Sequence, residues 1–379
     1  MTKFVHTADW QLGMTRHFLA EEAQARFTAA RIEAITSIGT LALQEGCSFV
    51  VVGGDVFESN QVERQVVVRS LEAMKSTPDV TFYLLPGNHD PLDAASVFRS
   101  KTFLDNCPRN VVVLESSEPV HAADGVEIVG APWLNKRPLV DLVTHALTGL
   151  PSDGTLRVVV GHGSTDSLSP DPHNPALVVL GDLEATIAAG TVHYVALGDR
   201  HSTTEVGRTG RIWYSGAPEP TAYDEIDPGN VLIVDLSPDS ATVERRRVGT
   251  WQFVRQDFDV TGPEDCLKVE HFLEDISDKA RTIVKLSLVG QLSLADMDRL
   301  EAILDHASDL LGALERWERR CDLVVLPDDD DFGGLGLSGF AAAGLEDLRE
   351  MGAGAGDDAL TARDALGLLY RLAGTAVTT

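Results

Sequence analysis

The residues best suited to chemistry follow one predicted strand after another in the first 201 residues of the chain. They are Asp9 with Gln11, Asp55, Asn88 with His89 and Asp90, His162, and Asp199 with His201. Carboxylate, amide and imidazole groups together are the ligands of divalent ions such as Mn²⁺, Fe²⁺ or Zn²⁺. Each residue alone also fits a helix cap, a turn or a hydrogen-bonded histidine. Because five strand ends carry such groups in order, the pattern favours a metal centre.

These residues need a layered core to bring them together. Apolar strands are expected at 4–6, 49–52, 81–85, 158–160 and 194–197, with later strands at 231–234 and 243–248. Apolar residues at helical spacing predict helices at 20–44 and 62–75, which lie between the first three of these strands. This alternation of strands and helices is typical of an α/β fold. Ligands in such folds sit at the carboxyl ends of strands, so residues far apart in the sequence can converge there.

The pattern changes after about residue 250. Strands at 251–260, 282–289 and 321–326 alternate with helices at 263–276 and 295–311, which predicts a small α/β module. An acidic and glycine-rich linker follows from 327, and then two short helices at 340–351 and 359–372. We therefore expect three domains, at 1–248, 249–326 and 327–379. The apolar face of the last helix indicates docking, either on a partner or on its own chain.

Composition limits the classes of function. The 379 residues include 31 Lys and Arg against 58 Asp and Glu, a net charge of −27. The negative electrostatic field of such a chain repels DNA and anionic membranes. This excludes a free-standing, charge-driven nucleic-acid binder but not a metal-dependent enzyme. The four cysteines form no CxxC pair, which is typical of reduced thiols in a cytosolic protein. No apolar run approaches membrane-spanning length, so a cytoplasmic location without membrane contact is expected.

The five motifs resemble those of the calcineurin-like metallophosphoesterases. The motifs are Asp9-Trp-Gln11, Gly-Gly-Asp55, Gly-Asn88-His89-Asp90, Gly-His162-Gly and Gly-Asp199-Arg-His201. Within that family they are most similar to the SbcD-type exonuclease subunits of DNA repair and their YhaO-like relatives. The resemblance implies a layered β-sandwich flanked by helices, a capping domain at 249–326 and a helical tail that binds an SMC-like coiled-coil ATPase. It also implies a homodimer and DNA as the substrate.

The resemblance further implies a role for each site residue. Asp9 and His201, with Gln11, would hold one ion, and Asn88, His162 and Asp199 would hold the other, with Asp55 bridging both. His89 would protonate the leaving oxygen, with its ring oriented by Asp90. Mn²⁺ is the expected ion, with Mg²⁺ or Fe²⁺ as alternatives. Arg16, His17 and Arg64 are candidates for contacts with the phosphate backbone.

Two positions depart from the family pattern, because Gln11 and Asp199 stand where histidines are usual. Asp199 offers a harder, anionic oxygen, which shifts preference toward Mn²⁺ or Mg²⁺, whereas an amide is a weak ligand. Two other functions therefore stay open. One is a phosphodiesterase acting on cyclic nucleotides or nucleotides, and the other is a scaffold with a weakened metal site.

Overall fold

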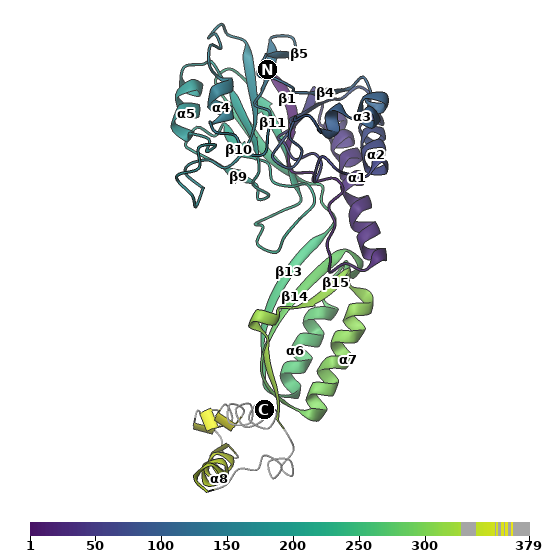
Figure 1. The fold of residues 1–379 in the computed structure, drawn as a ribbon, viewed down its shortest axis with the longest axis vertical. Helices are drawn as coiled ribbons and strands as arrows, with labels where there is room; N and C mark the ends of the chain where they lie inside the picture. Colours follow the sequence, from purple (N-terminus) through teal and green to yellow (C-terminus); the bar gives the residue numbers. More distant parts are fainter. Residues whose placement is uncertain (327–338, 353, 355–357, 360, 363–364, 367–379) are drawn as a thin grey trace. The chain divides into compact units, whose positions relative to one another are not determined.

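The chain divides into two compact units, Met1–Trp251 and Gln252–Thr379. The computed structural model (Figure 1) describes residues 1–326, 339–352, 354, 358–359, 361–362 and 365–366. The linker expected from residue 327 and most of the helix expected at 359–372 lie outside these residues. The assignment of three domains with the limits given above remains a prediction.

The first unit contains two six-stranded sheets. One has the order β12 (Ala241–Arg247), β11 (Asn230–Leu236), β1 (Thr2–Thr7), β2 (Phe49–Val52), β3 (Thr81–Leu84) and β4 (Val111–Val113). The other has the order β5 (Val120–Ala123), β6 (Val126–Gly130), β7 (Leu156–His162), β8 (Tyr194–Gly198), β10 (Ile212–Tyr214) and β9 (Thr204–Glu205). Strands β1 to β4 pair in parallel, and so do β6, β7, β8 and β10. Their carboxyl ends therefore meet at one edge of each sheet, where polar side chains can gather.

The two sheets pack face to face and helices cover the outer faces. Phe4 and Phe49 of the first sheet share one apolar core with Val158 and Tyr194 of the second. The first sheet is covered by α1 (Glu21–Gln44), α2 (Arg64–Lys75), the short η1 (Val97–Arg99) and α3 (Lys101–Asn106). The second is covered by α4 (Leu142–Ala146) and α5 (Leu180–Ala188). This arrangement confirms the expected layered α/β sandwich flanked by helices.

Helix α1 shows how the sequence specifies this packing. Phe27, Ala34, Ile35 and Ile38 recur at helical spacing and all are buried. Such a stripe places one side of a helix against a sheet. The opposite side of the helix is largely exposed and polar.

The second unit is a small α/β module. Its elements are β13 (Gln252–Val260), α6 (Pro263–Glu274), η2 (Lys279–Arg281), β14 (Thr282–Ser293), α7 (Leu294–Leu310), β15 (Ala313–Arg316), η3 (Glu318–Arg320) and β16 (Asp322–Leu326). Strand β14 pairs in parallel with β13, β15 and β16. Both α6 and α7 contribute to the apolar core that covers one face of this sheet. The sequence pattern missed β15, because its four residues contain only two apolar side chains.

The described part of the tail contains α8 (Phe340–Gly352), close to the helix expected at 340–351. Among the described residues, no helix is both long enough and apolar enough to cross a bilayer.

Candidate metal centre

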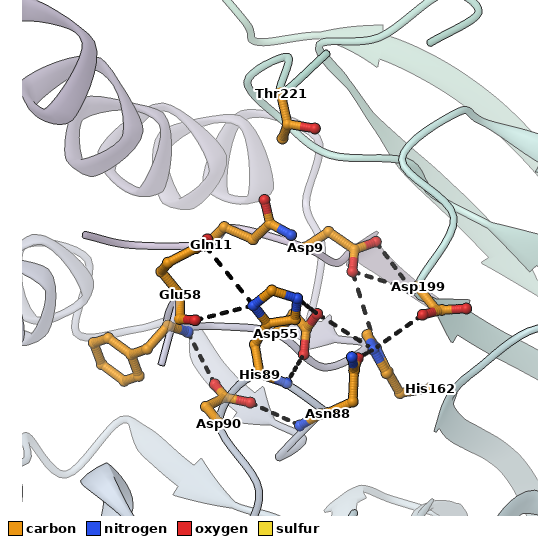
Figure 2. Close-up of polar contacts among 12 residues, drawn as sticks. Asp9, Gln11, Asp55, Glu58, Asn88, His89, Asp90, His162, Asp199 and Thr221 are labelled. Carbon is orange, nitrogen blue, oxygen red and sulfur yellow. Dashed lines mark hydrogen bonds and ion pairs between the residues drawn. The ribbon is translucent and has the colours of Figure 1, made fainter. Parts of the chain in front are cut away.

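Three buried side chains from both sheets of the first unit meet at the strand ends (Figure 2). Asp9 follows β1, Asp55 follows β2, and His162 ends β7. One ligand atom from each of these residues lies within 4.8 Å of the others. All three residues are at most 2% exposed. Two carboxylates and an imidazole at this separation can bind a divalent ion.

His162 is the centre of a wider group of oxygen atoms. Its Nε2 lies 2.6 Å from Asn88 Oδ1, 3.4 Å from Asp55 Oδ2 and 3.8 Å from Asp199 Oδ1. Its Nδ1 lies 2.8 Å from the carbonyl oxygen of Gly53 and donates a hydrogen bond to it. This bond turns Nε2 toward the three oxygens. Because a neutral Nε2 and these oxygens all present lone pairs, a proton or a metal ion must lie among them.

Backbone strain is concentrated at this centre. In the described part of the chain, five non-glycine residues have a positive φ, and four of them are expected ligands. These four are Asp9 (54°), Gln11 (44°), Asp55 (51°) and Asp199 (96°). The conformation costs about 1–2 kcal/mol per residue, and such strain clusters at functional sites. Backbone hydrogen bonds maintain it, from Asp9 to Gly54 at 3.1 Å and from Gln11 to Asp55 at 2.9 Å.

Two glycines allow the backbone to come this close to the ligands. A Cβ on Gly54, whose φ is +91°, would lie 2.3 Å from His162 Nδ1. A Cβ on Gly87 would lie 2.2 Å from Asp55 Oδ1. Non-bonded atoms do not approach one another this closely, so both positions require glycine.

Asp9 is fixed by the backbone of the last motif. The amide of Asp199 donates to both carboxylate oxygens of Asp9, at 3.0 and 3.2 Å. The first and last motifs, 190 residues apart, are therefore joined directly.

Gln11 and His201 face each other beside Asp9. Gln11 Nε2 lies 3.2 Å from His201 Nε2. The other amide atom, Gln11 Oε1, is buried and has no hydrogen-bond partner among the residues that the structure describes. An unsatisfied buried oxygen is unfavourable, and a bound cation would satisfy it. Gln11 therefore fits the ligand role expected of it, which remains a prediction.

His89 is held differently from the expected arrangement. Its Nδ1 donates to the backbone carbonyl of Glu58 at 2.9 Å, and its Nε2 lies 3.9 Å from Asp55 Oδ2. The buried carboxylate of Asp90 instead accepts the amides of Phe57 at 2.9 Å and Gly87 at 2.7 Å. The expectation that Asp90 orients the His89 ring is thus corrected. Asp90 ties the loops after β2 and β3 together, and Glu58 orients the ring.

The charges of the centre also favour a cation. Burial raises the pKa of Asp9 to about 6 and the pKa of Asp90 to about 7, and nearby Asp55 acts in the same direction. Burial opposes the charged form of His162, but Asp55 and the other carboxylates raise its pKa well above the usual value. Glu225, Asp9 and Asp55 also raise the pKa of His201. The carboxylates thus favour positive charge at the centre, and a divalent ion would supply it.

The three expected phosphate contacts do not form part of this cluster. Arg16 is half-buried and donates to the carbonyl of Thr221. His17 is exposed and its ring contacts Phe18. Arg64 is exposed at the first residue of α2. Their role toward a substrate remains a prediction.

Sequence reasoning missed three residues that contact the site. Glu58 orients His89, and Thr221 and Glu225 contact His201. Glu58 orients the ring through its backbone carbonyl, which any residue would offer at this position, so the residue type gives no signal for the role. Thr221 and Glu225 lie in an irregular segment after β10, where the sequence pattern offers no signal either.

A model of the calcineurin-like phosphoesterase family matches residues 2–202 of the chain. This match covers both sheets up to the end of β8 and all of the expected ligands. The chain therefore belongs to the calcineurin-like phosphoesterases, a family of divalent-metal enzymes.

The curated relatives are named as DNA-repair proteins and nucleases. A DNA double-strand break repair protein Mre11 from Halobacterium salinarum is 27% identical over 317 residues, which are 79% of this chain and 74% of that protein. A protein of the same name from Haloferax volcanii is 25% identical, over 77% of this chain and 62% of the relative. A subunit of the nuclease SbcCD from Rhodobacter capsulatus is 26% identical, over 63% of this chain and 67% of the relative.

Solved structures of distant proteins also align. Protein TT1561 of Thermus thermophilus aligns with a TM-score of 0.43 and 10% identity, over 65% of this chain and 99% of that one. A dimetal phosphatase from Danio rerio aligns with a TM-score of 0.42 and 12% identity, over 65% of this chain and 96% of that one.

Proposed function

We propose that this chain is a DNA-repair nuclease subunit that hydrolyses phosphodiester bonds with two divalent ions, Mn²⁺ being the proposed metal. The observation that carries the proposal is the convergence of Asp9, Asp55, Asn88, His162 and Asp199 in one cluster. Carboxylates outnumber the imidazole there, which suits Mn²⁺ or Mg²⁺. The names of the Mre11 and SbcCD relatives support DNA as the substrate.

The ligands would form two sets around a shared carboxylate. Asp55 would bridge the two ions, with Asp9, Gln11 and His201 around one and Asn88, His162 and Asp199 around the other. When bound, the ions would polarise the phosphoryl group and favour ionisation of the attacking water.

His89 would deliver a proton to the leaving oxygen. Its Nδ1 is engaged by the Glu58 carbonyl, so Nε2 is the nitrogen available for transfer. The His89 amide donates to Asp55 Oδ1 at 2.9 Å, which keeps the imidazole next to the bridging carboxylate. Asp90 supports this loop without touching the ring.

We also propose that the protein works in the cytoplasm as a homodimer with an SMC-like coiled-coil ATPase. The Rhodobacter relative is named as one subunit of a nuclease, which supports an enzyme of more than one kind of subunit. The module at 249–326 would serve as the capping domain, and the tail at 327–379 would bind the ATPase. Arg16, His17 and Arg64 would contact the phosphate backbone.

The test is Mn²⁺-dependent cleavage of linear double-stranded DNA by the purified chain. Asp55→Asn and His89→Ala should each lower the rate by about 100-fold or more. His121→Ala, a change of an exposed histidine in β5, is the matched control and should cleave like the wild type. Absence of cleavage by the wild type, alone and with the ATPase added, would contradict the proposal. Hydrolysis of cyclic nucleotides would then indicate a small-substrate enzyme instead.

A further inference from the structure

The three imidazoles of the centre share one arrangement. In each ring Nδ1 is engaged by a neighbouring acceptor, which leaves Nε2 for the centre. His162 and His89 use backbone carbonyls, of Gly53 at 2.8 Å and Glu58 at 2.9 Å. His201 instead uses side chains. We propose that Glu225 is a positioning residue whose carboxylate holds His201 with Nε2 directed at the metal centre.

The contacts of His201 support this role. Its Nδ1 lies 3.0 Å from Glu225 Oε1 and 2.7 Å from Thr221 Oγ1. The Thr221 hydroxyl in turn donates to the same carboxylate oxygen. A carboxylate is a stronger acceptor than a carbonyl, and carboxylates behind metal-binding histidines fix both the ring and its tautomer. The opposite nitrogen, Nε2, faces Gln11.

Glu225 itself has little freedom to move. Its side chain is only 6% exposed. Both of its oxygens accept the backbone amide of Thr221, at 3.1 and 3.0 Å. The next residue, Ile226, donates its amide to Ser202 Oγ at 2.9 Å, directly after His201 in the chain. The carboxylate is therefore fixed from two sides before any metal binds.

A buried arginine anchors the same segment to the first motif. The Arg31 guanidinium, on α1, donates to the carbonyl of Pro220 at 2.9 Å and to that of Trp10 at 3.1 Å. Trp10 stands between Asp9 and Gln11, and Pro220 directly precedes Thr221. One side chain thus supports both the segment that carries Gln11 and the segment that carries the His201 contacts. Gln11 and His201 keep their mutual position as a result.

The inference rests on the proposed metal-dependent function, and Mn²⁺ binding measured by calorimetry tests it without DNA. Glu225→Ala should weaken binding of one ion by about 10–100-fold. Glu225→Gln should show a smaller loss, because its amide keeps one acceptor oxygen for the three donors that now share the carboxylate. Asp224→Asn removes the same charge from the neighbouring position and should bind Mn²⁺ within about twofold of the wild type.

Thermal unfolding in EDTA separates positioning from folding. Glu225→Gln should unfold within a few degrees of the wild type while its Mn²⁺ affinity falls. If both Glu225 variants bind Mn²⁺ with wild-type affinity and stoichiometry, the inference is overturned. If Glu225→Ala does not fold, Glu225→Gln alone tests the inference, and an unchanged Mn²⁺ affinity of that variant rejects the positioning role of Glu225. A wild type that binds Mn²⁺ but does not cleave DNA would contradict the nuclease proposal and leave this inference intact.

Discussion

Asp199 combines an unusual backbone with an expected ligand role. Its φ of 96° lies outside the ranges that non-glycine residues usually adopt, whereas glycine adopts it without steric cost. Its carboxylate lies 3.8 Å from His162 Nε2, and its amide holds Asp9. The strain is therefore maintained by contacts that a metal site needs and a merely stable protein does not.

Asp199→Gly should consequently raise stability while it lowers metal affinity. Asp199→Ala is the matched control, since it removes the same carboxylate but keeps the strained φ. In EDTA, the glycine variant should be more stable than the alanine variant by about 1 kcal/mol in urea unfolding. Both variants should bind Mn²⁺ more weakly than the wild type. Equal stability of the two variants would show that the backbone here is not strained.

A second residue, His6, affects how the stability of the protein depends on pH. His6 is fully buried, with Nδ1 3.2 Å from the Tyr194 hydroxyl and Nε2 3.2 Å from the Leu197 carbonyl. Burial lowers its pKa from 6.5 to about 3. As the pH falls, His6 is therefore protonated in the unfolded chain before it is protonated in the folded protein. The contribution of His6 to stability is complete above about pH 6.5 and is lost as the pH falls toward 3.

The free energy of unfolding should fall by up to about 1.4 kcal/mol per pH unit because of His6. His6→Gln keeps a donor and an acceptor but does not titrate, so its unfolding free energy should fall less steeply between pH 6 and pH 4. His121→Gln, at an exposed histidine, should keep the wild-type slope. Urea titrations at several pH values measure the difference. Parallel slopes for wild type and His6→Gln would contradict the prediction.

At the scale of elements, the site depends on a close approach of the two sheets. A Cβ on Gly198, at the end of β8, would lie 2.0 Å from the carbonyl oxygen of Gly53, which follows β2. It would also lie 2.8 Å from Ala8 Cβ. Since Asp55 and Asp199 each follow one of these glycines by one or two residues, the approach of the strands sets the separation of their carboxylates.

Gly198→Ala should push the ends of β2 and β8 apart. Because the obstacle is backbone rather than a flexible side chain, we expect a loss of about 3 kcal/mol in unfolding free energy, the upper end of the usual cost of overpacking, and weaker Mn²⁺ binding. Gly181→Ala, in α5 with nothing within 4 Å of the added Cβ, should be neutral or stabilise by up to about 1 kcal/mol. Urea unfolding and Mn²⁺ calorimetry on both variants measure these effects, and an unchanged Gly198→Ala protein would refute the argument.

The same elements show what the sequence could predict. Apolar runs and helical stripes are local, so the predicted limits of β2 and α1 lie within a residue or so of the observed ends. Polar residues after strands are equally visible. Non-local packing decides which strands share a sheet, and it also brings β2 and β8 together across the sandwich. No local sequence pattern encodes this packing. Glu225 escapes sequence reasoning for the same reason, because its contact with His201 spans 24 residues of largely irregular chain.

At the scale of the whole molecule, the charge and the division into units bear on function. Against a net charge of −27, divalent ions at the centre would supply local positive charge toward a DNA backbone. The expected ligands and Glu225 all lie within Met1–Trp251, together with three apolar cores. The second unit has a core of its own. Folding and metal binding are thus expected to belong to the first unit.

The last residues of that unit are part of its core. Trp251 is fully buried, and its ring meets that of Phe27 on α1 with centroids 5.1 Å apart. The Glu219 carboxylate accepts the amides of Thr250 at 2.8 Å and Trp251 at 3.0 Å. The carbonyls of Glu219 and Pro220 are in turn bonded by Arg31. The end of the unit therefore supports the segment that leads to Glu225.

A fragment of residues 1–251 should fold cooperatively and bind Mn²⁺ with the stoichiometry of the full chain. A fragment of residues 1–248 lacks the Trp251 anchor and leaves the buried Glu219 carboxylate without its partners. It should therefore be less stable by about 3–5 kcal/mol, the usual cost of losing a buried aromatic side chain. Urea unfolding of the two fragments with calorimetry of Mn²⁺ binding decides the matter. Equal stability would place the end of the unit before Trp251, and failure of both to bind Mn²⁺ would make the second unit necessary for the centre.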